Sequence, residues 1–160
     1  MPIAYFDSSA FVKLLVEEEG SDVAAGLWDG SDAAVSSRLA YREVRAALAA
    51  AGRAGRLGRD DQRRAESAWE DFWAATRVVE LSSLIGQRAG QLTGEHLLRG
   101  ADAVHLASVL TVGAAECVLA VWDQRLSAGA KAAGVQVVPD NDDADVPDQD
   151  EAGDDDRASE

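Results

Sequence analysis

The stretch that decides the fold is Ile3-Ala4-Tyr5-Phe6-Asp7-Ser8-Ser9-Ala10-Phe11-Val12-Lys13-Leu14. Its apolar first part is too short for a helix and stops at an acid, Asp7, and a helical pattern begins directly after that acid. A buried parallel strand brings a carboxylate to the edge of a sheet in this way. Taken alone, Asp7 is more often the N-cap of such a helix than a functional group. Ser8 or Ser9 could cap the helix in its place.

Short apolar runs and amphipathic helices alternate along the rest of the chain. Further strands are expected at residues 33–36, 77–81, 118–122 and 135–138. Helices are expected at residues 21–28, 37–51, 59–76, 82–97, 103–112 and 124–133, the helix at 103–112 being opened by residues 100–102. This alternation implies right-handed crossovers between parallel strands. It predicts an α/β fold with three layers, α/β/α, around a central parallel sheet of about five strands.

The composition describes one globular domain without covalent cross-links. The chain has 160 residues, 47% of them hydrophobic, which suits a single core and is too short for two ordinary domains. Its one cysteine, Cys117, excludes an intrachain disulfide and a cysteine-rich zinc site. The sequence shows no signal peptide and no apolar run of the ~20 residues that a membrane span needs. We therefore expect a cytoplasmic protein with no membrane contact.

The negative charge is concentrated at the end of the chain. The formal net charge is −14, and residues 140–160 hold 11 acids and one arginine, a net of −10. Residues 1–139 hold 18 acids and 14 bases, a net of −4. We expect residues 140–160 to form an acidic disordered tail that aids solubility. Residues 1–139 then form the domain.

Four acids stand where the predicted fold could gather them. Asp7 and Asp123 each end a predicted strand, Asp102 opens a predicted helix, and Glu43 lies along the apolar face of another. The carboxyl ends of parallel strands meet at one edge of a sheet, where sites form. Clustered carboxylates repel one another unless protons or cations are present. Ligands that are all oxygen favour hard ions, so the sequence predicts a site for Mg²⁺, with Mn²⁺ as an alternative.

Other interpretations of these side chains remain open at this point. Each Asp could be only a helix N-cap. Glu43 could lie at the border of its helix and contact Arg42 or Arg45, and this is as probable as an inward position. His105 lies on the apolar helix after Asp102 and is expected to be packed and hydrogen-bonded rather than a base. The sequence does not indicate an arrangement of Ser, His and Asp typical of a hydrolase triad.

Four segments of the sequence resemble one known family. They are Tyr5-Phe6-Asp7-Ser8-Ser9-Ala10, Tyr41-Arg42-Glu43-Val44, Ala101-Asp102-Ala103-Val104-His105-Leu106-Ala107 and Val121-Trp122-Asp123-Gln124-Arg125-Leu126. In this order they resemble the pattern of PIN domains, most of all the VapC-type toxins of toxin–antitoxin pairs. The resemblance runs from about residue 3 to residue 139, and its most specific piece is Asp-Ala-Val-His-Leu-Ala. The acidic tail lies outside the pattern.

The resemblance implies a function as well as a fold. It implies a Mg²⁺-dependent endoribonuclease that forms a homodimer and is inhibited by a small antitoxin protein. Carried over by position, Asp7, Glu43, Asp102 and Asp123 would be the catalytic, metal-binding acids. Ser9 would help to place water beside the first of them.

Contacts with RNA are expected on the arginine-rich stretch that follows Glu43. Residues 38–64 hold eight of the 15 basic residues of the chain. Arginines near Glu43 could bind phosphate groups; the candidates are Arg42, Arg45, Arg53 and Arg56. An ordinary solvated helix face is the alternative.

Two rival functions are compatible with part of the pattern. The first is a phosphohydrolase that uses Asp7 as its nucleophile, but Ser9 stands where the haloacid-dehalogenase pattern has a second Asp. The second is a catalytically silent PIN fold that only binds RNA or protein. The complete set of four acids disfavours it, because a binding module does not need them.

Overall fold

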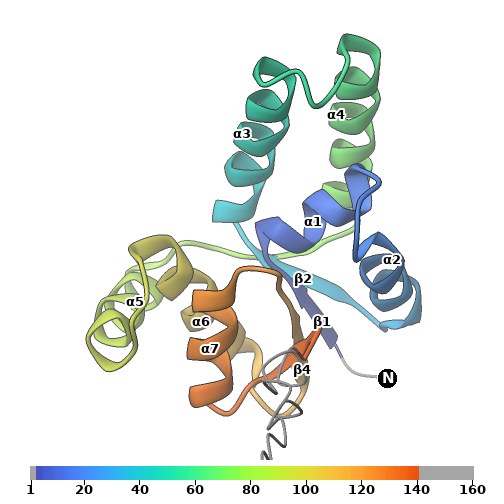
Figure 1. Ribbon diagram of the computed structural model, residues 1–160. Helices are drawn as coiled ribbons and strands as arrows, with labels where there is room; N and C mark the ends of the chain where they lie inside the picture. Colours follow the sequence, from blue (N-terminus) through green and yellow to red (C-terminus); the bar gives the residue numbers. More distant parts are fainter. Residues whose placement is uncertain (1–2, 141–160) are drawn as a thin grey trace, which may run out of the picture.

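The computed structural model describes residues 3–140 (Figure 1). Its centre is a sheet of five strands in the order β3-β2-β1-β4-β5, and every neighbouring pair is parallel. The strands are β1 (Ile3–Phe6), β2 (Ala34–Ser37), β3 (Arg77–Val79), β4 (Cys117–Ala120) and β5 (Gln136–Val138). The predicted tail lies outside the described residues except for Asp140.

Seven helices of the described chain cover the two faces of this sheet. They are α1 (Ser8–Leu15), α2 (Ser21–Gly30), α3 (Leu39–Arg53), α4 (Arg59–Ala74), α5 (Ser83–Glu95), α6 (Gly100–Val112) and α7 (Gln124–Ala132). Figure 1 shows α1 to α4 on one side of the sheet and α5 to α7 on the other. The predicted three-layer α/β fold with a parallel sheet of about five strands is confirmed.

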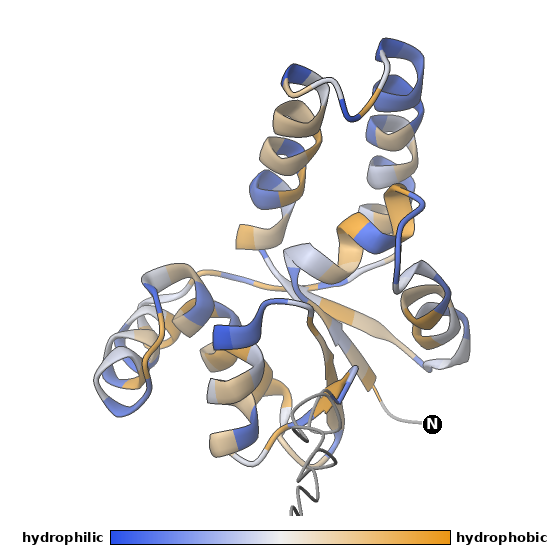
Figure 2. Cartoon of the chain, viewed as in Figure 1, coloured by the Kyte–Doolittle hydropathy of each residue, from blue (hydrophilic) through white to orange (hydrophobic). Residues whose placement is uncertain are grey.

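Strand β1 supplies both halves of the core because side chains alternate across a strand. Tyr5 packs with Leu106 of α6 and Leu119 of β4 in one cluster. Phe6 faces the opposite way and packs with Phe11 of α1 in the other cluster, which also contains Trp69 of α4. Apolar residues follow the strands and the inner helix faces, while the outer end of the α3–α4 hairpin is hydrophilic (Figure 2).

The aromatic residues Trp69, Phe72 and Trp73, spaced at i, i+3 and i+4 on α4, belong to the core. Trp69 is fully buried, and its ring lies 4.8 Å from that of Phe11 and 5.3 Å from that of Trp73. Phe72 packs at 4.8 Å against Trp28 of α2. These contacts place the three aromatic side chains in the core on the α1–α4 side of the sheet.

Two details of the sequence-based prediction are wrong. Strand β4 ends at Ala120, and Trp122 beyond it lies against Gly20. Leu84 and Leu97, apolar residues of the helix expected at residues 82–97, are 72% and 97% exposed. The face of α5 that packs carries Ile85, Ala89 and Leu92, and Leu97 lies beyond the end of the helix. Leu84 therefore falls just outside the buried stripe.

No helix within residues 3–140 is both long enough and apolar enough to cross a lipid bilayer.

Gly20 offers a test of packing beside the sheet edge. It has a φ of 89°, and a Cβ there would lie 2.7 Å from Nε1 of Trp122. Gly55 has a φ of 73° but nothing within 4 Å of such a Cβ. We expect Gly55→Ala to cost about 1–2 kcal/mol in the free energy of unfolding, from backbone strain alone. Gly20→Ala should cost about 1–3 kcal/mol more because Trp122 must move. Urea unfolding compares the two, and equal losses would show that Trp122 adapts freely.

Candidate active site

Asp7 is a helix cap and a buried carboxylate at the same time. It follows β1 with extended backbone angles and is the N-cap of α1, where its Oδ1 accepts hydrogen bonds from the Ala10 N–H at 2.9 Å and the Ser9 hydroxyl at 2.6 Å. The residue is only 3% exposed. Burial raises the pKa of its carboxyl from 3.8 to about 6, and the two hydrogen bonds offset only part of that rise. The capping and the edge-of-sheet interpretations both hold for Asp7.

Glu43 points toward the sheet from α3. Its Oε1 lies 2.6 Å from Nε2 of His105, which is 2% exposed on α6. Arg45 pairs with Glu70 of α4, its Nη1 lying 3.5 Å from Oε1 of that residue. The interpretation in which Glu43 pairs with Arg42 or Arg45 at the surface is therefore wrong, because the facing helix α6 offers a buried imidazole instead.

Asp102 and Asp123 share one arginine. Nε of Arg99 lies 3.1 Å from Oδ2 of Asp102, and Nη2 lies 3.2 Å from Oδ2 of Asp123. Asp102 is in the first turn of α6 and 8% exposed, and Asp123 is the N-cap of α7, accepting from the Leu126 N–H at 3.0 Å. Arg99 was not among the residues expected from the sequence. Its position three residues before Asp102, one helical turn away, could have indicated an ion pair with that acid.

A second set of contacts joins the two pairs of acids. The Ser9 hydroxyl donates to Asp7 and accepts from the backbone N–H of Trp122 at 2.9 Å, next to Asp123. The charge of Glu43 acts on Asp7 as well and raises the pKa of its carboxyl. The structure thus brings all four predicted acids to the edge where β1 and β4 end.

The chemistry of these four carboxylates fits a hard cation. All four acids offer carboxylate oxygens, the preferred ligands of Mg²⁺ and Mn²⁺. As the side chains lie, no three His, Cys, Asp or Glu residues between residues 3 and 140 are grouped to hold a metal ion. Arg99 supplies the positive charge between Asp102 and Asp123 instead. Its side chain is 61% exposed.

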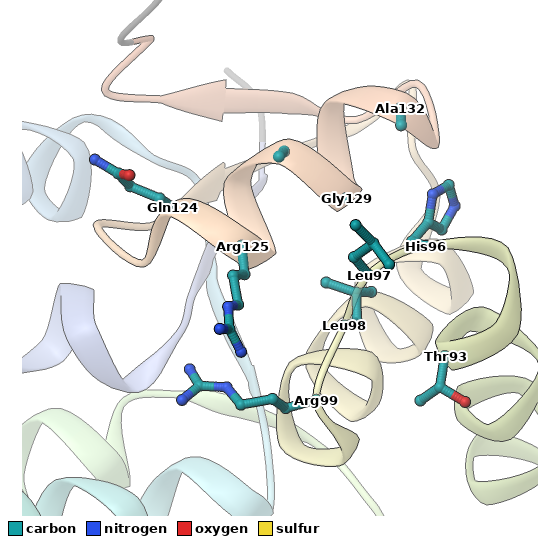
Figure 3. Close-up of a pocket in the computed structure, with 10 residues that line it drawn as sticks. Thr93, His96, Leu97, Leu98, Arg99, Gln124, Arg125, Gly129 and Ala132 are labelled. Carbon is teal, nitrogen blue, oxygen red and sulfur yellow. The ribbon is translucent and has the colours of Figure 1, made fainter.

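An open cavity of about 830 Å³ is lined by residues 96–99 and by residues of α7, and it includes Arg99, the partner of Asp102 and Asp123. Figure 3 shows Arg99 and Arg125 extending toward each other from the starts of α6 and α7, beside an apolar wall that includes Leu97 and Leu98. Two guanidinium groups beside each other suit an anionic ligand.

The predicted RNA-binding arginines do not form one patch. Arg42 and Arg45 flank Glu43 at the start of α3, near the sheet. Arg53 is the last residue of α3, ten residues after Glu43 and ~15 Å further along the axis. Arg56 lies in the α3–α4 connection, at the end of the hairpin away from the sheet (Figure 1). The expectation that Arg53 and Arg56 lie near Glu43 is wrong, because one long helix separates them.

A three-layer fold around a parallel sheet is the architecture that the resemblance to PIN domains implied. Residues 4–143 match the PIN domain family, and the chain belongs to that family. Within it, the chain is 63% identical to Ribonuclease VapC49 of Mycobacterium tuberculosis (strain ATCC 25618 / H37Rv) over 139 residues, which are 87% of this chain and 96% of the relative.

Solved structures of low sequence identity share the fold. VapC20 of Mycobacterium tuberculosis, a Sarcin-Ricin loop cleaving toxin, has a TM-score of 0.59 at 17% identity, covering 78% of this chain and 93% of that one. A toxin–antitoxin complex from Klebsiella pneumoniae has a TM-score of 0.56 at 20% identity, covering 79% of this chain and 91% of that one.

Proposed function

We propose that this protein is a Mg²⁺-dependent endoribonuclease and the toxin of a toxin–antitoxin pair. The observation that carries the proposal is the convergence of Asp7, Glu43, Asp102 and Asp123 at one edge of the sheet, in a chain 63% identical to a ribonuclease of the same family. A buried carboxylate such as Asp7 lowers stability, and function is the usual reason for keeping one.

Each acid has a role that its surroundings support. Asp7, Glu43, Asp102 and Asp123 would hold Mg²⁺, or Mn²⁺ in its place. Both hydrogen bonds to Asp7 fall on Oδ1, which leaves Oδ2 for the cation. When bound, such an ion offsets the charge of a phosphodiester and makes water a better nucleophile. Ser9 holds Asp7 in place and ties it to the backbone before Asp123.

Arginines at the same edge suit an RNA backbone. Arg99 would leave Asp102 and Asp123 when the cation binds and would then face the cavity together with Arg125. Both could contact phosphates on either side of the cleaved bond. Such contacts predict that RNA affinity falls as salt rises.

The remaining parts of the proposal concern partners. We expect a small antitoxin protein as the inhibitor, a homodimer as the assembly and the cytoplasm as the location. The antitoxin is supported by the Klebsiella pneumoniae complex, in which a chain of the same fold belongs to a toxin–antitoxin assembly.

Removal of the metal tests the proposed reaction. The purified protein should cleave a structured RNA with Mg²⁺ or Mn²⁺, lose that activity in EDTA and recover it when the metal is restored in excess. The products should carry 5′-phosphate and 3′-hydroxyl ends, as the family resemblance implies. Cleavage that persists in EDTA would exclude the proposed chemistry. Phosphate release from small monoesters would point to a phosphohydrolase, and binding without cleavage to an RNA-binding module.

A further inference from the structure

A chain of buried hydrogen bonds leads from the sheet to Glu43. The backbone N–H of Ser37, at the end of β2, donates to Oη of Tyr5 at 3.0 Å. Oη of Tyr5 lies 2.8 Å from Nδ1 of His105, and Nε2 of the same ring lies 2.6 Å from Oε1 of Glu43. Tyr5 is 0% exposed and His105 2% exposed, so protein groups have to satisfy their polar atoms.

One assignment of hydrogens satisfies every member of this chain. The Ser37 N–H is a donor only, so Tyr5 accepts from it and has its own O–H to give. Glu43, as a carboxylate, is an acceptor only, so Nε2 of His105 must carry a hydrogen. In a neutral imidazole Nδ1 is then an acceptor, and it receives the Tyr5 O–H. The Tyr5 phenol is fully buried, and its one O–H has Nδ1 of His105 at 2.8 Å as an acceptor.

The same chain ties together the elements that carry three of the four acids. Tyr5 lies two residues before Asp7 on β1, and His105 lies one helical turn after Asp102 on α6. Glu43 is the acid at the end of the chain, on α3. A shift of His105 would therefore change the distance between these carboxylates as well as the orientation of Glu43.

We propose that Tyr5 and His105 act as positioning residues, which lock the Nε2–H form of the imidazole and hold Oε1 of Glu43 so that its other oxygen faces the cation. This inference rests on the proposed function, because it assigns a partner to one of the proposed metal-binding acids. Without the imidazole N–H, repulsion from Asp7 would push Glu43 outward, and its side chain is already 27% exposed. Partners of this kind typically change metal affinity by 10- to 100-fold.

The hydrogen positions can be tested in the unmodified protein. Nitrogen-15 NMR of the histidine rings distinguishes the two neutral forms and the charged form of an imidazole. The chain has two histidines, so a His96→Gln variant assigns the signals of His105. We expect His105 to carry its hydrogen on Nε2, with Nδ1 unprotonated and hydrogen-bonded. A hydrogen on Nδ1, or on both nitrogens, would overturn the proposed chain. This measurement needs neither metal nor RNA.

Two substitutions at His105 separate positioning from packing. In His105→Gln the side-chain amide can take the place of Nε2 and donate to Glu43. In His105→Asn the shorter amide takes the place of Nδ1 and cannot reach Glu43. Both bury a polar amide in the same place, so their melting temperatures should fall by similar amounts. A purely structural role for His105 would affect the two variants alike.

Manganese binding provides the readout. Free Mn²⁺ is followed by electron paramagnetic resonance in the full chain, and Asp7→Asn serves as the blank because the 11 acids of residues 140–160 also attract cations. We expect affinity to fall by about 10- to 100-fold in His105→Asn and to stay within a few-fold of the unmodified protein in His105→Gln. Equal affinities in the two variants would overturn the positioning role. If the unmodified protein binds no more Mn²⁺ than the Asp7→Asn blank, the proposed function itself fails, whatever the NMR result.

Discussion

Replacing Asp7 by Asn is expected to reduce RNA cleavage by about 10²- to 10³-fold. The substitution keeps the shape of the side chain and its ability to cap α1, but it removes the negative charge that a divalent cation requires. Stabilisation of a transition state by a bound cation amounts to several kcal/mol, and each 1.36 kcal/mol is tenfold in rate. Single-turnover cleavage at saturating Mg²⁺ measures the loss.

The same substitution should stabilise the protein when no metal is bound. The Asp7 carboxyl has a pKa of about 6 in the folded protein and 3.8 as the reference value, so the folded state holds the proton more tightly. The favourable contribution of the Asp7 carboxyl to the free energy of unfolding is therefore fully present below about pH 3.8, and it is lost as the pH rises through about 6. The difference corresponds to about 3 kcal/mol. In EDTA at pH 8, the free energy of unfolding of Asp7→Asn should be higher than that of the unmodified protein by up to that amount. Near pH 4 the two free energies should differ little.

Exposed Asp71 on α4 provides the control for both measurements. Asp71→Asn removes one negative charge without touching the acids at the sheet edge, so cleavage and the pH dependence of stability should stay as in the unmodified protein. If Asp7→Asn retains full cleavage, or shows no gain in stability at pH 8 without metal, the buried carboxylate does not have the role proposed for it.

Replacing Trp69 by Ala is expected to cost about 3–5 kcal/mol in the free energy of unfolding. Trp69 is fully buried between α1, α3 and α4, with ring centroids 4.8 Å from Phe11, 6.0 Å from Tyr41 and 5.3 Å from Trp73. A loss of this size is a large part of the stability of an ordinary domain. Because Phe11 lies on the helix that Asp7 caps, the cavity should also loosen the candidate active site.

Trp69→Phe is the matched variant. Within residues 3–140 the indole Nε1 of Trp69 has no hydrogen-bond partner, so phenylalanine keeps an aromatic ring and removes an unsatisfied buried donor. We expect it to cost less than half as much as Trp69→Ala in urea unfolding. Similar losses for the two variants would show that the indole itself, and not the filled volume, holds α4 against α1.

The sheet could be predicted from the sequence for a physical reason. Buried parallel strands need continuous apolar runs, and residues 3–6 and 118–122 are such runs between helical patterns. The ends of the strands and helices were harder to predict, because the sequence can stay apolar after the backbone hydrogen bonds of a strand or helix have ended. Trp122 is an example, since it follows β4 and lies against Gly20. Leu97 is another, being apolar and 97% exposed beyond α5.

The sequence by itself determined the three-layer parallel fold and the four acids that meet at its edge, because both follow from where apolar runs end and helices begin. Only the tertiary structure decided which groups surround those acids. Arg99 lies between Asp102 and Asp123, and His105 lies against Glu43 at a separation of 62 residues. Periodicity reports which face of its own helix a residue occupies. Which side chain a residue contacts on a neighbouring helix depends on how α3 and α6 pack across the end of the sheet.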